Sequence, residues 1–146
     1  MISPRPNPAA RGAFINLTLQ HTLAHVYRAI LESIACSLRE NLELMAGAGL
    51  QIDLVRAIGG GAGSPLWLQI KADVTGQEIE KPVVTEAAVL GAVVLAATST
   101  GNFSSMLEAG EALYRAERLF SPRRAEQQRY EQCYEAYLRY QKTLFP

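Results

Sequence analysis

The sequence has 146 residues, with 14 basic and 14 acidic side chains and a hydrophobic fraction of 49%. This length fits one domain or a large piece of one, and the composition is that of a globular chain rather than a disordered one. A net charge of zero gives no electrostatic reason to bind nucleic acid or an anionic membrane surface. No apolar run reaches the roughly 18 residues of a membrane-spanning helix.

The N-terminal segment, residues 1–16, is first rich in proline and then short and apolar. We interpret it as an incoming loop. Because prolines stand where a secretory signal would have its apolar region, we expect a cytoplasmic protein without a signal peptide. Cys36 and Cys133 fit this expectation, since each lies in a predicted helix and their spacing matches no metal motif. Both are predicted to be reduced thiols.

The first predicted helix covers residues 17–45. Its apolar residues recur at steps of three and four and so form one stripe: Leu23, Tyr27, Ile30, Ile34, Leu38, Leu42 and Met45. Glycines in the segment 46–49 should end this helix, since glycine accepts the left-handed conformation of a C-cap. The apolar segment 52–58 is then predicted to be a short buried strand.

A second helix is predicted to begin with Ser64 at its N-cap and Pro65 at its first position. It should run to about Val74 and stop at Gly76. A second strand is predicted over residues 78–83.

The remaining elements are predicted to be helices. The segment 86–98, with Thr85 as its cap, is nearly all small and apolar, so we expect it to be buried on several sides. A short helix is expected over 104–113, and a final helix should open at Ser121 and Pro122 and end near Leu144. Three tyrosines on one face of this last helix are interpreted as core or domain-packing residues rather than as a partner surface: Tyr130, Tyr134 and Tyr137. The sequence therefore predicts a mixed α/β fold in which helices outweigh strands.

A run of glycines, residues 59–63, joins the first predicted strand directly to the helix after Ser64. Glycine lets a ligand approach the backbone, and a helix N-terminus adds free N–H groups and partial positive charge. These features suit a nucleotide, although a tight turn that binds nothing would need the same glycines. The Walker A pattern fails because Lys71 is far away. The dinucleotide pattern fails because Ser64 or Leu66 would replace its third glycine.

The segment 58–76 resembles the adenosine-side loop of the FGGY carbohydrate kinases, above all of the xylulokinase and gluconokinase branch. In that family a Gly-Gly-Gly-Ala turn is followed by serine, tryptophan, glutamine and an Ala-Asp pair. The matching residues here are Gly59, Gly60, Gly61, Ala62, Ser64, Trp67, Gln69, Ala72 and Asp73. Gly63 departs from the pattern, because many members carry a larger, often basic residue there.

Two other segments resemble the same family. The family's C-terminal signature is matched by Gly12, Phe14, Leu17, His25, Val26, Ala29, Ile30, Leu31 and Glu32. Asn16 stands where the signature has glycine. Asparagine tolerates left-handed backbone better than most residues, so we expect the turn to survive. Residues 86–92 resemble the packed helix beside the family's nucleotide site. The resemblance thus runs from about residue 7 to the C-terminus.

The resemblance implies an α/β, actin-like ATPase (ribonuclease H-like) fold. Residues 1–146 would be the partial C-terminal lobe of a two-domain sugar kinase, without the N-terminal strands of that lobe and without the sugar-binding N-terminal domain. The implied cofactors are ATP or ADP and Mg²⁺, held mainly by residues outside this chain. The implied partners are the missing N-terminal kinase domain and a xylulose- or gluconate-like sugar. The implied nucleotide-binding residues are Gly59, Gly60, Gly61, Ala62, Gly63 and Ser64.

The resemblance places the catalytic base outside this chain. The only aspartates are Asp53 and Asp73, and neither precedes the Gly-Thr pair of a family phosphate loop. A positioned base is worth about 10²–10⁴ in rate, and holding both substrates in line about 7–11 kcal/mol. We therefore predict no kinase turnover by these residues alone. Part of a kinase should expose an apolar docking face, and so be poorly soluble or form a homodimer when isolated. The alternative, a non-catalytic remnant that binds nucleotide or a partner, should be a well-behaved monomer.

The two histidines and the tryptophan are two further candidates for a functional site. His21 and His25 have the spacing of a zinc pair, but Thr22 replaces the glutamate of the metalloprotease pattern and no third ligand is evident, so no metal site is expected. Trp67 is interpreted as a packing residue of its helix rather than as a platform that stacks on adenine.

Overall fold

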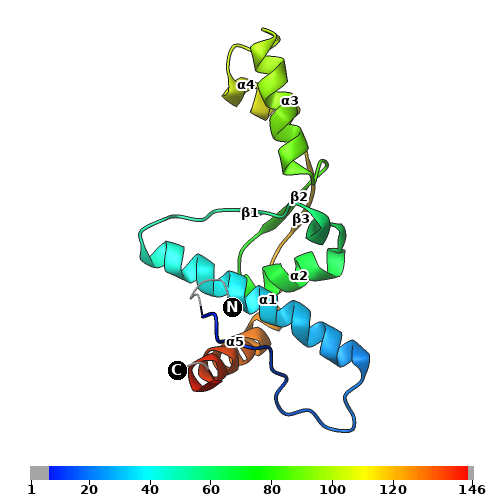
Figure 1. The fold of residues 1–146 in the computed structure, drawn as a ribbon, viewed down its shortest axis with the longest axis vertical. Coiled ribbons are helices and arrows are strands. Elements are labelled where there is room, and N and C mark those ends of the chain that lie inside the picture. The colour runs from blue at the N-terminus through cyan, green and yellow to red at the C-terminus, as the bar shows by residue number, and fades with distance from the viewer. Residues whose placement is uncertain (1–6, 145–146) are drawn as a thin grey trace.

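The computed structural model describes residues 7–144 (Figure 1). The mixed α/β order predicted from the sequence is confirmed. Residues 1–6 of the predicted N-terminal loop lie outside the described range, and residues 7–16 contain no helix or strand. The elements are α1 (Leu23–Gly47), β1 (Val55–Arg56), the 3₁₀ turn η1 (Gly60–Gly63), α2 (Pro65–Thr75), β2 (Ile79–Pro82), α3 (Ala87–Ser99), α4 (Met106–Leu113), β3 (Ala116–Phe120) and α5 (Arg124–Leu144).

The sheet has the order β1-β2-β3. Helices α1, α2 and α5 lie on one side of this small sheet, and α3 and α4 extend from its other end (Figure 1). Strand β1 pairs parallel to β2, with Val55 opposite Ile79, and β3 pairs antiparallel to β2, with Phe120 opposite Ile79. The first predicted strand is shorter than expected, since only two of its residues are in β1. Strand β3 was not predicted, because four of its five residues are exposed and its sequence does not alternate between polar and apolar residues.

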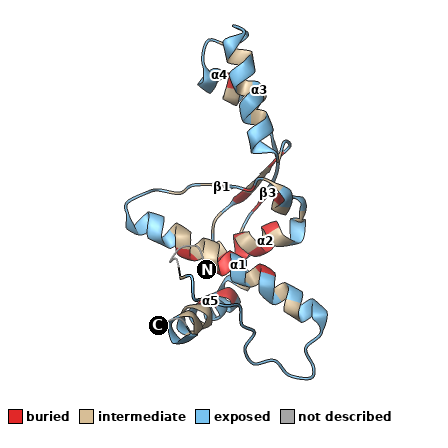
Figure 2. Cartoon of the chain, in the orientation of Figure 1, coloured by how far each residue is buried: buried red, intermediate tan, exposed pale blue. Residues whose placement is uncertain are grey.

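Two hydrophobic clusters meet at α2, which contributes residues to both (Figure 2). The helical cluster lies between α1, α2 and α5 and contains Leu31, Ala35, Cys36, Ile70, Val74, Tyr130 and Tyr134. The sheet cluster lies between the sheet, η1 and α2 and contains Ala57, Ala62, Leu68, Ala72, Ile79 and Phe120. Tyr137 packs against the helical cluster, so the core position predicted for the three tyrosines is confirmed. Helix α2 is thus held on two sides.

Helix α1 begins later than predicted, at Leu23 instead of residue 17. Upstream of it, Asn16 has φ 62°, which confirms the left-handed turn expected there. The predicted apolar stripe is wrong as the buried face, because none of its residues is buried and Leu23 and Tyr27 are exposed. The core residues of α1 are instead Leu31, Ala35 and Cys36.

Helix α3 contradicts the prediction that it is buried on several sides. No residue of α3 is buried, and the α3–α4 hairpin projects away from the rest of the chain (Figures 1 and 2). The reason is that α4 packs against α3, while no other helix or strand of residues 7–144 packs closely against it. The predicted cap is also wrong, because Glu86 and not Thr85 occupies the N-cap position. Within residues 7–144, no helix is long and apolar enough to span a membrane.

Both cysteines are free thiols, as predicted, but their surroundings differ. Burial raises the pKa of both thiols, that of Cys36 to about 12, but Cys133 is exposed on α5 whereas Cys36 is buried. Because the thiolate is the reactive form, we expect iodoacetamide at about pH 8 to alkylate one thiol of the folded chain and both thiols in urea. Mass spectrometry of the products checks this, with Cys133→Ser as the variant that should lose the modification of the folded chain. Equal labelling of both thiols in the folded chain would contradict it.

Candidate nucleotide-binding site

The glycine run predicted as a binding loop forms, with Ser64, a compact turn between β1 and α2. We call residues 59–64 the glycine turn. Gly59 has φ 72° and ψ −170°, a backbone conformation open essentially to glycine alone. Its N–H donates to the carbonyl of Thr85 at 2.8 Å, and its own carbonyl accepts the N–H of Ala62 at 3.0 Å. One end of the turn is therefore tied to the segment that follows β2.

The turn presents backbone outward and one side chain inward. Gly60 and Gly63 are exposed, whereas Ala62 is 1% exposed and packs in the sheet cluster. Among residues 7–144, no hydrogen bond engages the N–H groups of Gly60 and Gly61. Of the predicted site residues, Ala62 is therefore the one that is buried as a whole, backbone included.

The start of α2 lies directly after the turn and confirms the helix start predicted from Ser64 and Pro65. The Ser64 hydroxyl oxygen accepts the N–H of Trp67 at 3.3 Å, and its carbonyl accepts the N–H of Leu68 at 3.0 Å. The far end of the helix is also as predicted, with Gly76 as a left-handed C-cap. The helix N-terminus thus places partial positive charge beside the glycine turn.

Exposed apolar residues flank the glycine turn along the chain. Ile58 precedes it, Leu66 follows it on the first turn of α2, and both are exposed. An exposed backbone with apolar neighbours and a helix N-terminus can bind a ligand that has both a flat apolar part and an anionic part.

Trp67 lies on the first turn of α2, directly after the glycine turn. It packs against the helical cluster, and the Nζ of Lys71 lies 4.0 Å from the centre of its ring. Its indole N–H is buried. These contacts agree with the interpretation of Trp67 as a packing residue.

Asp73 and Gln69, which the resemblance singled out, join α2 to the start of α5. Asp73 is 2% exposed, and its carboxylate accepts the backbone N–H of Arg123 at 2.8 Å and the guanidinium at 2.7 Å. The amide of Gln69 donates to Asp73 at 3.0 Å and to the Ser121 carbonyl at 2.9 Å. This network places the start of α5 at Arg124 instead of Ser121. Sequence reasoning missed Arg123. The signal that could have found it is that a buried carboxylate, such as that of Asp73, generally needs a cationic partner.

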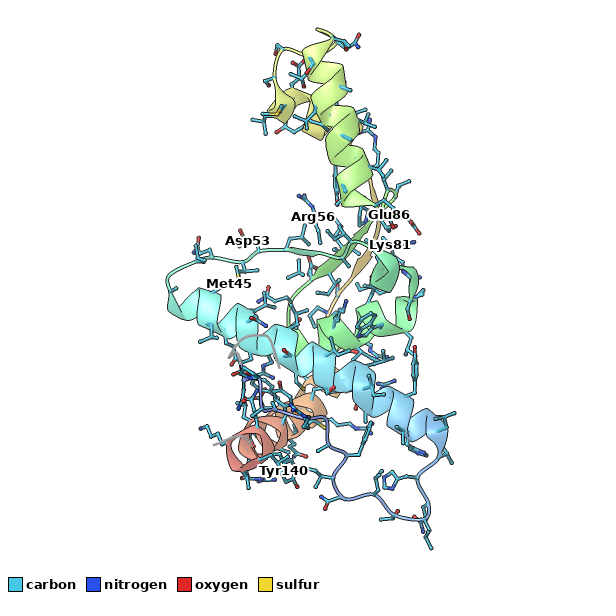
Figure 3. The ribbon with its side chains drawn as sticks, in the orientation of Figure 1. Met45, Asp53, Arg56, Lys81, Glu86 and Tyr140 are labelled. Carbon is cyan, nitrogen blue, oxygen red and sulfur yellow. The ribbon has the colours of Figure 1, made fainter. Side chains whose placement is uncertain are left out.

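A second network ties β1 to the root of the α3–α4 hairpin, and Figure 3 labels its residue Arg56 beside the sheet. The Nε of Arg56 lies 2.9 Å from the carboxylate of Glu80, which also accepts the hydroxyl proton of Tyr114. The guanidinium lies 4.4 Å from the centre of the Tyr114 ring. The Tyr114 hydroxyl, and then Arg56, lower the pKa of Glu80. The Glu80 carboxylate is thus held by structural contacts. Sequence reasoning missed the group of Arg56, Glu80 and Tyr114 because these residues are far apart in the chain.

The other segment that resembles the family's signature lies against α5. The side-chain amide of Asn16 donates to the hydroxyl of Tyr140 at 3.3 Å, and Figure 3 labels Tyr140 on α5. Glu32 forms an ion pair with Arg28 at 2.7 Å and accepts the hydroxyl proton of Tyr130 at 2.9 Å. These contacts attach α1 and the segment before it to α5.

The two histidines each bind a threonine. The Nδ1 atom of His21 accepts the N–H of Thr18 at 3.0 Å, and that of His25 accepts the N–H of Thr22 at 3.1 Å. In the part of the chain that the structure describes, no three His, Cys, Asp or Glu side chains are grouped to hold a metal ion.

A cavity of about 340 Å³ lies elsewhere, between the end of α1 and the segment that leads to β1. Its lining includes Arg39, Glu43, Leu50, Asp53 and Gln77 and no residue of the glycine turn. Figure 3 labels Asp53 on this segment. This cavity, an open hollow, is therefore separate from the glycine turn.

Comparison with known proteins identifies the family. The FGGY family of carbohydrate kinases, C-terminal domain, matches residues 1–100. The chain is 35% identical over 135 residues to a xylulose kinase of Staphylococcus epidermidis, covering 92% of this chain and 27% of that protein. It is 39% identical over 140 residues to a glycerol kinase of Bordetella parapertussis, covering 91% of this chain and 27% of the relative.

The fold agrees with this comparison. The crystal structure of xylulose kinase from Rhodospirillum rubrum matches with a TM-score of 0.81 and 29% identity, over 96% of this chain and 28% of that one. The chain thus spans about a quarter of the length of the relatives it matches. The expected actin-like ATPase fold is confirmed, and the chain belongs to the FGGY family of carbohydrate kinases, where it corresponds to part of the C-terminal domain.

Proposed function

We propose that this chain is the adenosine-nucleotide-binding part of an ATP-dependent carbohydrate kinase. The proposed contacts are made by the glycine turn: Gly59, Gly60, Gly61, Ala62, Gly63 and Ser64. The observation that carries the proposal is the conformation of Gly59, which only glycine adopts readily and which places exposed backbone at the N-terminus of α2. Ile58 and Leu66, both exposed, supply apolar surface for the adenine ring.

The rest of the reaction is assigned to residues outside this chain. Phosphoryl transfer depends almost entirely on positioning and on charge stabilisation. We propose that the missing N-terminal kinase domain supplies the base and the sugar pocket. Mg²⁺ and the phosphates of ATP are held mainly by loops outside the chain. The proposed acceptor is a xylulose- or gluconate-like sugar, which the xylulose kinases among the relatives support.

The exposed apolar surface favours part of a larger kinase over a self-sufficient remnant. Leu23 and Tyr27 on α1, and Val89 and Leu95 on α3, are all exposed. Isolated folded chains rarely leave so many large apolar side chains in water, because their burial is the main driving force of folding. We propose that further parts of the same kinase cover these faces. The isolated chain would then have low solubility or form homodimers, whereas a non-catalytic remnant would be a stable monomer.

Two assays on the purified 146-residue chain test this function. Isothermal titration calorimetry should detect ADP binding, with inorganic phosphate as the control ligand that lacks the adenosine. A coupled assay for ADP formation, with ATP, Mg²⁺ and either xylulose, gluconate or glycerol, should give no sugar-dependent rate. Absence of ADP binding would contradict the nucleotide site. Sugar-dependent turnover would contradict the assignment of the base and the sugar pocket to residues outside this chain.

A further inference from the structure

The ring of Trp67 occupies the space that a side chain at position 61 would need. A Cβ atom built on Gly61 would lie 2.6 Å from Cζ3 of Trp67, 3.3 Å from Cε3 and 3.4 Å from Cη2. The other glycines of the turn differ, since a Cβ on Gly59, Gly60 or Gly63 would meet nothing within 4 Å. The contact is therefore specific to one glycine and to the six-membered part of the indole.

The position of the indole is set independently of the turn. Trp67 packs against the helical cluster, and Lys71, one helical turn further on, lies over its ring at 4.0 Å. A ring held by the core and by its own helix is a firm support for the backbone that touches it.

The middle of the glycine turn needs such a support. Gly59 is tied to the carbonyl of Thr85, and the side chain of Ala62 is held in the sheet cluster. Gly60 and Gly61, between these two anchors, have no side chain of their own to pack, and glycine loses more conformational freedom on ordering than any other residue. The Trp67 ring is the side chain that lies against this stretch, at Gly61.

We propose that Trp67 is a positioning residue for the glycine turn. Its ring sets the place of Gly61 and so holds the exposed backbone in the conformation that receives the nucleotide. Trp67 itself touches no ligand in this account. The inference rests on the proposed function, because it concerns the affinity of the same site. A turn held in place before binding gives higher affinity, since less ordering is left for the binding step.

The test is a double-mutant cycle on ADP affinity, measured by calorimetry on the 146-residue chain. Trp67→Phe removes the outer part of the indole and keeps an aromatic ring, and Gly61→Ala introduces a methyl group into the ring's space. We expect each change alone to raise the Kd for ADP about tenfold, equivalent to about 1.4 kcal/mol. The double variant should bind better than the product of the single effects predicts, because the alanine methyl group fills the space that phenylalanine leaves. The matched control is Gly60→Ala, alone and with Trp67→Phe, where the effects should simply multiply.

The outcomes separate this inference from the proposed function. If the unaltered chain does not bind ADP, the proposed site fails and the inference fails with it. If the unaltered chain binds ADP but Trp67→Phe does not change the Kd, or if the Gly61→Ala and Trp67→Phe effects multiply, the inference alone is overturned.

Urea unfolding of every variant shows whether it is folded. If the Trp67→Phe variant does not fold, the inference is tested on the single variant Gly61→Ala, in which Trp67 is kept. Trp67 is the only tryptophan of the sequence. We therefore expect Gly61→Ala to raise the Kd for ADP and to change the tryptophan fluorescence, whereas Gly60→Ala should leave the fluorescence unchanged. Equal tryptophan fluorescence of these two variants would overturn the inference.

Discussion

Replacing Asp73 with alanine should lower the free energy of unfolding by about 3 kcal/mol. The carboxylate of Asp73 is buried on α2 and accepts the backbone N–H of Arg123 and the side-chain amide of Gln69. Alanine would leave both donors without this acceptor, and a donor left unsatisfied in the interior costs about 1–3 kcal/mol. The Arg123 guanidinium is exposed and can turn to water, so its loss from the ion pair adds little.

Urea unfolding followed by circular dichroism measures this effect. Asp53→Ala is the matched control, because Asp53 is the other aspartate of the sequence and is exposed. Its replacement should change the stability by less than about 0.5 kcal/mol. Asp73→Asn should fall between the two, because the amide oxygen can still accept one hydrogen bond. Equal effects at the two aspartates would show that the Asp73 network does not hold α5 against α2.

Replacing Gly59 with alanine should raise the Kd for ADP at least about tenfold and destabilise the chain by about 1–3 kcal/mol. At φ 72° and ψ −170° an alanine is strained by its own backbone, although a Cβ atom there would meet nothing within 4 Å. Relief of this strain requires rotation of the backbone. That rotation would pull the N–H of residue 59 away from the carbonyl of Thr85, so the turn would lose its fixed end.

Calorimetry with ADP and urea unfolding together check this prediction. Gly60→Ala is the control in the same turn, because Gly60 does not have a positive φ and also has open space around it. Its effect on stability should be small. If Gly59→Ala and Gly60→Ala had the same Kd for ADP and the same stability, the backbone conformation of Gly59 would have no role in the site.

Elements with local signals were predicted well from the sequence. Ser64, Pro65 and Gly76 mark the ends of α2 through hydrogen bonds and backbone angles that involve near neighbours only. Asn16 in the signature-like segment is left-handed as expected. The glycine turn was located for the same reason, since it is one continuous stretch of the chain.

Features that depend on distant parts of the chain could not be predicted. An apolar helix such as α3 was expected to be buried, but the described chain contains only α4 to cover it. The start of α5 is set by Asp73, which is 50 residues away from Arg123. In the site, the sequence indicated the glycines but not their supports, because the carbonyl of Thr85 reaches the turn only through the fold.

The most direct test of the central claim is an ADP titration of the isotope-labelled chain, followed by NMR of the backbone amides. The proposed site predicts chemical-shift changes centred on residues 59–64, with smaller changes at Thr85 and at the start of α2. Gly59→Ala should strongly reduce these changes at the same ADP concentration. Shift changes centred instead on the cavity beside Arg39 and Asp53, or no changes at all, would contradict the assignment of the glycine turn as the nucleotide site.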